Sequence, residues 1–137
     1  MLEKAIELAN IAHRGQTDKG GNPYILHPKA VAEGVDSIEC KIVAYLHDVC
    51  EDSSITPEEL LAKGFGHRIV HAVWLLTRTN GVSYNKYLKA IKSNDIARVV
   101  KIADLKHNMD ISRIPNPTKQ DYKRIERYKK ALHYLQE

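Results

Sequence analysis

Apolar residues recur at helical spacing through most of this chain, and this pattern restricts its fold more than any other feature. Residues 2–13 place their apolar side chains three or four positions apart, on one face of a helix, and residues 67–77 do the same. Strand signals are nearly absent, because no stretch alternates Val, Ile or Thr with polar residues around a hairpin dipeptide. The sequence therefore predicts an all-α fold, an orthogonal helical bundle.

Turn-forming residues and caps indicate where the predicted helices begin and end. A run rich in glycine and proline at 14–28 predicts a long loop after the first helix. Ser37, Ser83 and Asn94 suit helix N-caps, and Thr56-Pro57-Glu58-Glu59 has the pattern of a capping box. We expect helices at 2–13, 29–35, 38–49, 57 to about 64, 67–77, 84–92, 95–110 and 118–136.

Length and composition indicate one globular domain. The 137 residues are 43% hydrophobic, and no apolar run approaches the roughly 20 residues that cross a membrane. The N-terminal stretch mixes charged and apolar residues at helical spacing, unlike a signal peptide. Cys40 and Cys50 form no CxxC pair, so we expect free thiols in a cytoplasmic protein. The net charge of +4 does not by itself indicate a nucleic-acid polymer as partner.

Four side chains that can bind a metal or move a proton lie within six residues. They are His47, Asp48, Glu51 and Asp52, and they follow an apolar stretch. Burying charge there is unfavourable unless a cation compensates it, and a metal that holds water would make the chain a candidate hydrolase. If the helix continues past Asp48, all four side chains can face one cavity. The alternative is an ordinary helix C-terminus with solvated acids.

A second candidate segment centres on Asp104, which lies inside another apolar helix. His107 and Asn108 follow three and four residues later and share its helical face. A buried acid in this setting is either paired or bound to a metal. The alternative to a metal is an ion pair with Lys101 or Lys106.

The loop at 14–28 supplies a third candidate, His27. Pro28 suits the first turn of the next helix and favours an extended backbone at His27, which would aim the imidazole away from that helix. Lys19 and the glycines beside it could approach phosphate oxygens.

Together these segments resemble the HD-domain metal-dependent phosphohydrolases, and more closely the hydrolase domain of the RelA/SpoT alarmone enzymes and the small alarmone hydrolases. The matching segments are AHRGQ at 12–16, PYILHP at 23–28, LHDVCED at 46–52 and VKIADLKHNM at 100–109. They occur in the family's order. The resemblance implies a bundle of the HD-domain type, a single HD phosphohydrolase domain over residues 1–137 without a synthetase domain.

The resemblance also implies roles for particular residues. It implies one divalent metal, usually manganese, with the ligands His27, His47, Asp48 and Asp104. Independently, two imidazoles and two carboxylates suit Mn²⁺ better than a closed zinc site, although another divalent metal is possible. Glu51 and Asp52 match the catalytic acidic pair that orients or deprotonates the attacking water. Lys19 and Asn108 match positions that contact the nucleotide.

The implied reaction removes the 3′-pyrophosphate from guanosine tetra- or pentaphosphate, (p)ppGpp, and gives GDP or GTP. One position departs from the pattern, because Asp18 stands where these hydrolases commonly carry an arginine that stacks on guanine. A carboxylate cannot stack and would repel phosphate. A different substrate, such as NADPH or another 3′-phosphorylated nucleotide, therefore stays open. A third hypothesis is a non-catalytic module that senses a nucleotide or binds a protein, against which the complete set of ligands and acids argues.

Overall fold

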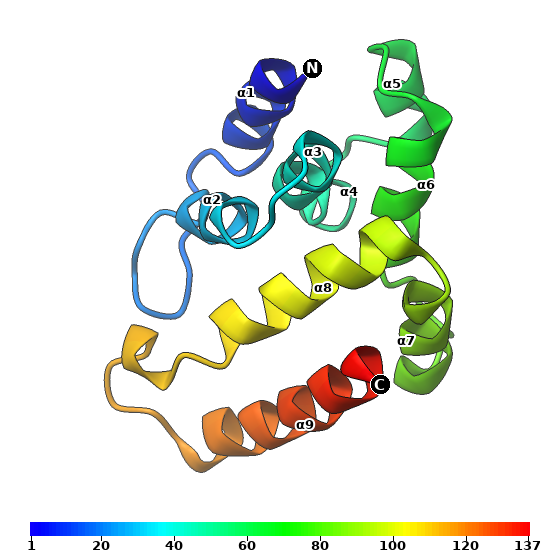
Figure 1. The fold of residues 1–137 in the computed structure, drawn as a ribbon. Coiled ribbons are helices and arrows are strands. Elements are labelled where there is room, and N and C mark those ends of the chain that lie inside the picture. Colours follow the sequence, from blue (N-terminus) through cyan, green and yellow to red (C-terminus); the bar gives the residue numbers. More distant parts are fainter.

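The computed structural model describes residues 1–137 and consists of helices joined by loops (Figure 1). The elements are α1 (Leu2–Ala12), α2 (Leu26–Glu33), α3 (Ile38–Leu46), α4 (Val49–Asp52), α5 (Pro57–Ala62), α6 (His67–Leu76), α7 (Tyr84–Lys92), α8 (Asp95–Asn108), the 3-10 turn η1 (Ile111–Arg113) and α9 (Lys119–Gln136). An isolated bridge pairs Thr17 with Pro23 in the loop before α2. The predicted all-α fold is confirmed. None of the helices combines the length and the hydropathy required to cross a bilayer.

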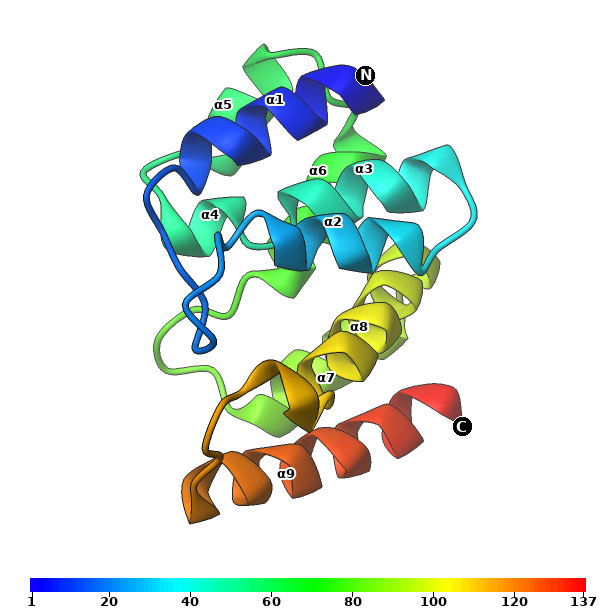
Figure 2. The ribbon, with the colours of Figure 1, turned by 90° about the vertical axis from the view of Figure 1, so that its left-hand side faces the viewer.

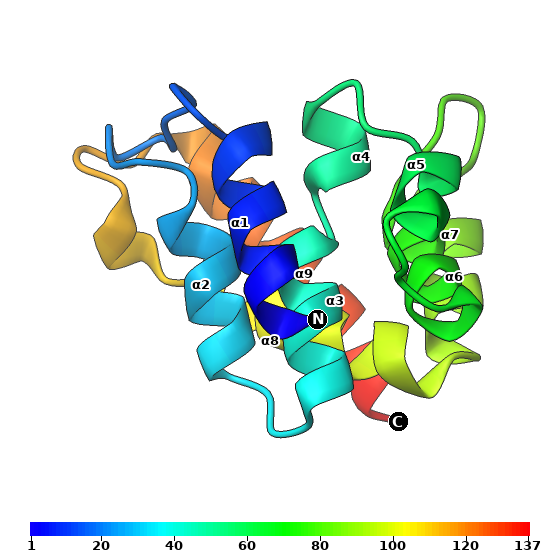
Figure 3. The same ribbon diagram turned by 90° about the horizontal axis from the view of Figure 1, so that it is seen from above.

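Helix α3 lies at the centre of the bundle and packs against α1, α2, α6 and α8. Figure 2 shows α2 and α3 side by side, with α1 across them, and Figure 3 shows α5 to α7 on the opposite side from α1 and α2. Helix α8 passes beneath α2 and α3, and α9 packs on its outer side and against α7 (Figure 1). The core is therefore a set of crossing helices that meet around α3 and α8.

The N-caps expected from the sequence are present. The side chains of four residues each accept a hydrogen bond from the backbone N–H three residues later: Ser37, Thr56, Ser83 and Asn94. The box at Thr56 is only half formed, because Glu59 accepts from the Thr56 hydroxyl at 3.4 Å rather than from its backbone. A complete capping box starts α9, where Thr118 and Asp121 bond reciprocally. Local chemistry thus sets most helix starts.

The helix predicted over 38–49 is divided in two, which corrects the sequence expectation. Helix α3 ends at Leu46 and α4 starts at Val49, so His47 and Asp48 form the link between them. The His47 ring bonds back to the carbonyl of Ala44, while Asp48 bonds to Tyr24 of the distant loop. The bond from Tyr24 to Asp48 is a tertiary contact, and together with the local bond of His47 it outweighs the preference for a continuous helix. One unbroken helix face therefore does not carry the whole acidic segment.

Helix α2 begins three residues earlier than predicted, at Leu26. His27 is therefore helical, and the expectation of an extended backbone there is wrong. Pro28 fits because amide groups in the first turn have no helical partner to lose. The amides of Leu26 and His27 bond to the carbonyls of Pro23 and Tyr24, which extends the turn back into the loop.

Candidate functional site

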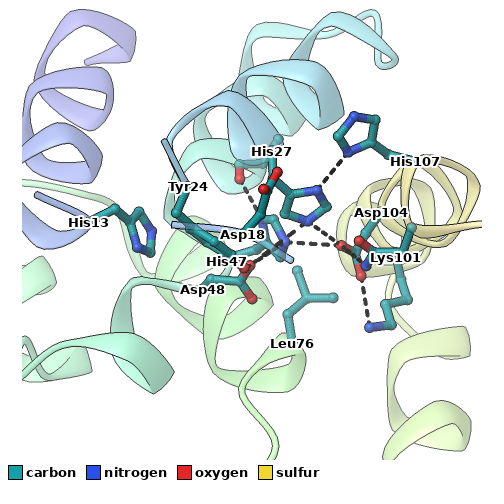
Figure 4. Close-up of polar contacts among 12 residues, drawn as sticks. His13, Asp18, Tyr24, His27, His47, Asp48, Leu76, Lys101, Asp104 and His107 are labelled. Atoms are coloured by element: carbon teal, nitrogen blue, oxygen red, sulfur yellow. Dashed lines mark hydrogen bonds and ion pairs between the residues drawn. The ribbon is translucent and has the colours of Figure 1, made fainter. Parts of the chain in front are cut away.

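The four predicted metal ligands meet between α2, the α3–α4 link and α8 (Figure 4). Asp104 Oδ1 lies 2.8 Å from His27 Nε2 and 3.3 Å from His47 Nε2. Asp48 Oδ2 lies 3.1 Å from His47 Nε2 and 3.9 Å from His27 Nε2. Donor atoms of His27, His47 and Asp104 lie within 4.8 Å of one another and face a common centre, and Asp48 lies beside this centre through its contact with His47. We call these four residues the His–Asp cluster.

The protonation of His47 shows why the His–Asp cluster fits a cation. Its Nδ1 donates to the Ala44 carbonyl at 2.5 Å, which leaves Nε2 facing two carboxylates without a hydrogen-bond partner of its own. Although burial opposes a charged ring, Asp48 and Asp104 raise the pKa of His47 well above its ordinary value. A positive charge at this point, either a proton or a metal ion, therefore offsets the two buried acids.

His107 contacts the imidazole of His27, the other histidine of the His–Asp cluster. The Nδ1 atoms of His27 and His107 are 2.7 Å apart, and the two rings stack with their centroids at 5.0 Å. Burial, Arg113 and His27 lower the pKa of His107 to about 4, so the ring of His107 is neutral at pH 7. Its Nδ1 can therefore accept a hydrogen bond. We assign the proton to His27 Nδ1, which leaves His27 Nε2 free to bind a metal.

Asp104 uses its two oxygens for different partners. Oδ1 faces the histidines and accepts from Asn108 Nδ2 at 3.2 Å, while Oδ2 lies 2.9 Å from Lys101 Nζ. The ion pair with Lys101, an alternative to metal binding in the sequence, is therefore present together with the cluster. Although burial opposes ionisation, Lys101 and the two histidines hold the pKa of Asp104 well below its ordinary value.

The loop before α2 contributes a residue that sequence reasoning missed, Tyr24. Its hydroxyl donates to Asp48 Oδ2 at 2.5 Å, and its ring lies against buried His13, with centroids 4.8 Å apart. His13 in turn bonds Gln16, whose amide reaches the backbone carbonyl of Asp52 at 3.0 Å. This chain of contacts ties the loop to both the link and α4. The PYILHP motif contains Tyr24, so the signal was present beside His27.

Glu51 and Asp52, the predicted catalytic pair, lie exposed on α4. Partial desolvation and the charge of Asp48 raise the pKa of each carboxyl group. Glu51 Oε1 also accepts from the backbone amide of Arg78, which lies just beyond α6. Both acids therefore lie within the electrostatic reach of Asp48, which makes each of them easier to protonate than a free carboxyl group.

A cavity of about 280 Å³ opens beside His27, between the loop, η1 and α9. We call it the basic pocket because three cations line it: Lys19, Arg113 and Arg124. Asn108 lines it too, so both predicted nucleotide contacts, Lys19 and Asn108, share one cavity with a cluster histidine. Lys19 and Arg124 both pair with Asp121, at 3.2 and 3.1 Å. Neither arginine could be found from the sequence, because only the fold brings them to the loop.

Asp18 also lines the basic pocket, but its charge is already satisfied. Oδ1 accepts from the amides of Gly20 and Asn22, each at 2.9 Å, and Oδ2 lies 3.6 Å from Arg113 Nη2. The repulsion that we expect between Asp18 and phosphate is therefore partly offset, because Arg113 lies beside this carboxylate and two amides donate hydrogen bonds to it. The cation beside Asp18 is therefore Arg113, which belongs to η1.

A family model described as HD domain matches residues 5–107. The chain belongs to the HD domain family. The match includes the whole His–Asp cluster, the acidic pair on α4 and most of α8. The His–Asp cluster therefore lies within the HD domain, and the donor atoms of His27, His47 and Asp104 are close enough together to hold one metal ion.

Curated relatives match this chain over a small part of their own, much longer sequences. The chain is 34% identical over 134 residues to the Probable GTP pyrophosphokinase of Mycobacterium leprae, which covers 88% of this chain and 17% of the relative. It is 32% identical over 117 residues to the guanosine-3′,5′-bis(diphosphate) 3′-pyrophosphohydrolase of Haemophilus influenzae, covering 74% of this chain and 17% of the relative. The chain thus spans less than a fifth of the length of these relatives.

A solved structure supports the fold. It is described as a metazoan ortholog of SpoT that hydrolyzes ppGpp and plays a role in starvation responses. The two structures match with a TM-score of 0.80 and 19% identity, over 98% of this chain and 84% of the other. The HD fold is therefore shared over nearly the whole length.

Proposed function

We propose that this HD domain is a metal-dependent nucleotide phosphohydrolase that removes the 3′-pyrophosphate from guanosine tetra- or pentaphosphate, with manganese as its metal. One observation carries the proposal. His27 belongs both to the His–Asp cluster and to the wall of the basic pocket, so a bound phosphate would lie against the metal ligands. Relatives named as ppGpp pyrophosphohydrolases supply the substrate class. The cytoplasm stays the predicted compartment, in keeping with two free cysteines.

Different residues of the chain would bind the metal and activate the water. His27, His47, Asp48 and Asp104 would hold the metal, which supplies positive charge to the reacting phosphate and acidity to water. Glu51 and Asp52 orient the attacking water and take its proton. The water oxygen bonds to phosphorus, the bond from phosphorus to O3′ breaks, and O3′ takes up the proton that the acids removed from the water. GDP or GTP and pyrophosphate result.

The basic pocket would hold the phosphates and ribose of the substrate. Lys19, Arg113 and Arg124 provide donors, and Asn108 provides an amide within the same cavity. Each of the three cations already has a carboxylate partner. A bound phosphate would therefore join an existing network of ion pairs. Three cationic side chains in one cavity suit a substrate that carries several phosphates.

A second candidate substrate class follows from Asp18, which cannot stack on a base and is tied to Arg113. A different nucleotide, such as NADPH or another 3′-phosphorylated nucleotide, would use the same metal centre and acids. The two candidates differ in the nucleotide that the basic pocket binds, and both require hydrolysis of a phosphate ester at the same metal centre.

Pyrophosphate release from ppGpp by the purified protein with Mn²⁺ tests the proposal. We expect turnover that disappears with Asp48→Ala and with Glu51→Ala. A parallel panel containing ppGpp, NADPH and 3′-phosphorylated mononucleotides separates the two substrate classes. Turnover of a panel member but not of ppGpp would refute the alarmone assignment and keep the phosphohydrolase. Absence of turnover with every nucleotide, together with no bound divalent metal, would support the non-catalytic binding module instead.

A further inference from the structure

A second cavity, of about 570 Å³, lies between α7 and α9. We call it the α7–α9 groove, and its lining includes Tyr84, Leu88, Lys89, Arg127, Lys130 and Tyr134. It shares no residue with the basic pocket or the His–Asp cluster. Its volume falls within the roughly 300–1,000 Å³ of typical small-molecule sites. Nothing in the proposed hydrolysis uses it.

The charge of the groove is uncompensated. Lys89 comes from α7, while Arg127 and Lys130 come from α9, and no carboxylate lines the cavity. None of these three cations forms an ion pair. The basic pocket differs, because each of its cations has an acid within 4 Å. Cations that converge from two walls without acids favour a ligand with clustered negative charge.

The remaining walls of the groove are aromatic and apolar. The Tyr84 ring has the guanidinium of Arg78 at 5.2 Å and that of Arg127 at 5.9 Å from its centroid. Lys92 Nζ lies 4.4 Å from the centre of the Tyr134 ring. A cation therefore lies over each of these tyrosine rings, and the tyrosines together with Leu88 and Ala131 give the groove an aromatic and apolar wall beside its charges. The buried hydroxyl of Tyr84 also has no hydrogen-bond partner.

We propose that the α7–α9 groove binds a nucleoside phosphate. The base lies against Tyr84 and Tyr134, and the phosphates lie between Lys89, Arg127 and Lys130. A purely apolar ligand would leave three cations unmatched, and an inorganic phosphate would leave the aromatic walls uncovered. The proposal is independent of the hydrolytic function, because the groove contains none of its residues.

Two-dimensional NMR of the full chain, titrated with GTP in Mg²⁺ buffer, tests the proposal. GTP lacks the 3′-pyrophosphate and is therefore not consumed by the proposed hydrolysis. We expect the amide signals of Leu88 and Ala131 to shift with saturation. The double variant Arg127→Ala/Lys130→Ala should weaken binding at these signals by about tenfold or more. The matched variant Lys119→Ala/Lys123→Ala removes the same charge from exposed positions of α9 outside both cavities and should leave the affinity unchanged.

Each other outcome overturns the proposal. Shifts confined to residues around Lys19 and Asn108 would place the nucleotide only in the basic pocket. Equal weakening in both double variants would reduce the effect to general attraction between charges. If pyrophosphate produces the same shifts with the same affinity as GTP, the base does not contribute to binding. The dispersion of the NMR signals verifies that each variant is folded.

Discussion

The hydroxyl of Tyr24 donates a 2.5 Å hydrogen bond to Asp48 Oδ2, which joins the loop before α2 to a carboxylate of the His–Asp cluster. Burial and the charge of Asp48 raise the pKa of Tyr24, so the phenol keeps its proton and continues to donate. This bond limits the positions that Asp48 can take. Tyr24 is therefore a positioning residue for the proposed metal site.

Replacing Tyr24 with phenylalanine tests this role. The ring and its packing against His13 remain, while the bond to Asp48 is lost. We expect affinity for Mn²⁺ to fall by about 10- to 100-fold, as for other residues that orient a metal ligand. Titration calorimetry measures it, with exposed Tyr122→Phe as the control. Unchanged affinity in Tyr24→Phe would show that the bond does not position Asp48.

Lys101→Met should destabilise the metal-free protein. Lys101 and the buried Asp104 form an ion pair at 2.9 Å, and removing Lys101 takes away the cation that contributes most to holding Asp104 charged. We expect the free energy of unfolding to drop by about 3–5 kcal/mol. Added Mn²⁺ should restore part of this loss, because the ion supplies charge beside Asp104. Urea unfolding with and without metal measures both effects, and Lys106→Met, at an exposed position on the same helix, should change neither.

The pH dependence of hydrolysis should report on Glu51. Partial desolvation, followed by Asp48 and Asp52, raises the pKa of this carboxyl group above its ordinary value. A general base must be deprotonated to act, so the rate should fall as the pH decreases through the pKa of Glu51. This fall should occur at a higher pH than the ordinary glutamate pKa of about 4.3. Glu51→Gln should lower kcat by about 10²- to 10⁴-fold. If Glu51→Gln keeps the acidic limb and the rate of the wild type, another group is the base.

Gly20→Ala should destabilise the loop that lines the basic pocket. A Cβ at Gly20 would lie 2.4 Å from the backbone oxygen of Arg113, so the loop or η1 has to move. We expect a loss of about 1–3 kcal/mol in the free energy of unfolding, typical of overpacking. Gly66→Ala is the control, because a Cβ there meets nothing within 4 Å. Equal stability of the two variants would contradict the close packing of the loop on η1.

Several features of this protein follow from the sequence alone. Helix positions depend on local apolar spacing and on caps such as Ser83 and Asn94, and the structure agrees with them to within a few residues. Buried charge inside apolar stretches pointed to His47 and Asp104, because such groups require a partner wherever they lie. The order of four motifs then indicated the HD domain, which the family model confirms.

Only the tertiary structure decided how these residues are held. The position of Asp48 at the break between α3 and α4 depends on its bond from Tyr24, a contact between distant segments. The contacts of His27 with Asp104 and His107 are likewise made across the fold. Asp18 looked repulsive in the sequence, yet Arg113, far along the chain, lies beside it and changes the charge of the pocket. Local preferences extend over one or two helical turns, whereas ion pairs and packing act between any groups that the fold brings together. The residues that meet in the His–Asp cluster could therefore be named from the sequence, and their electrostatic surroundings could not.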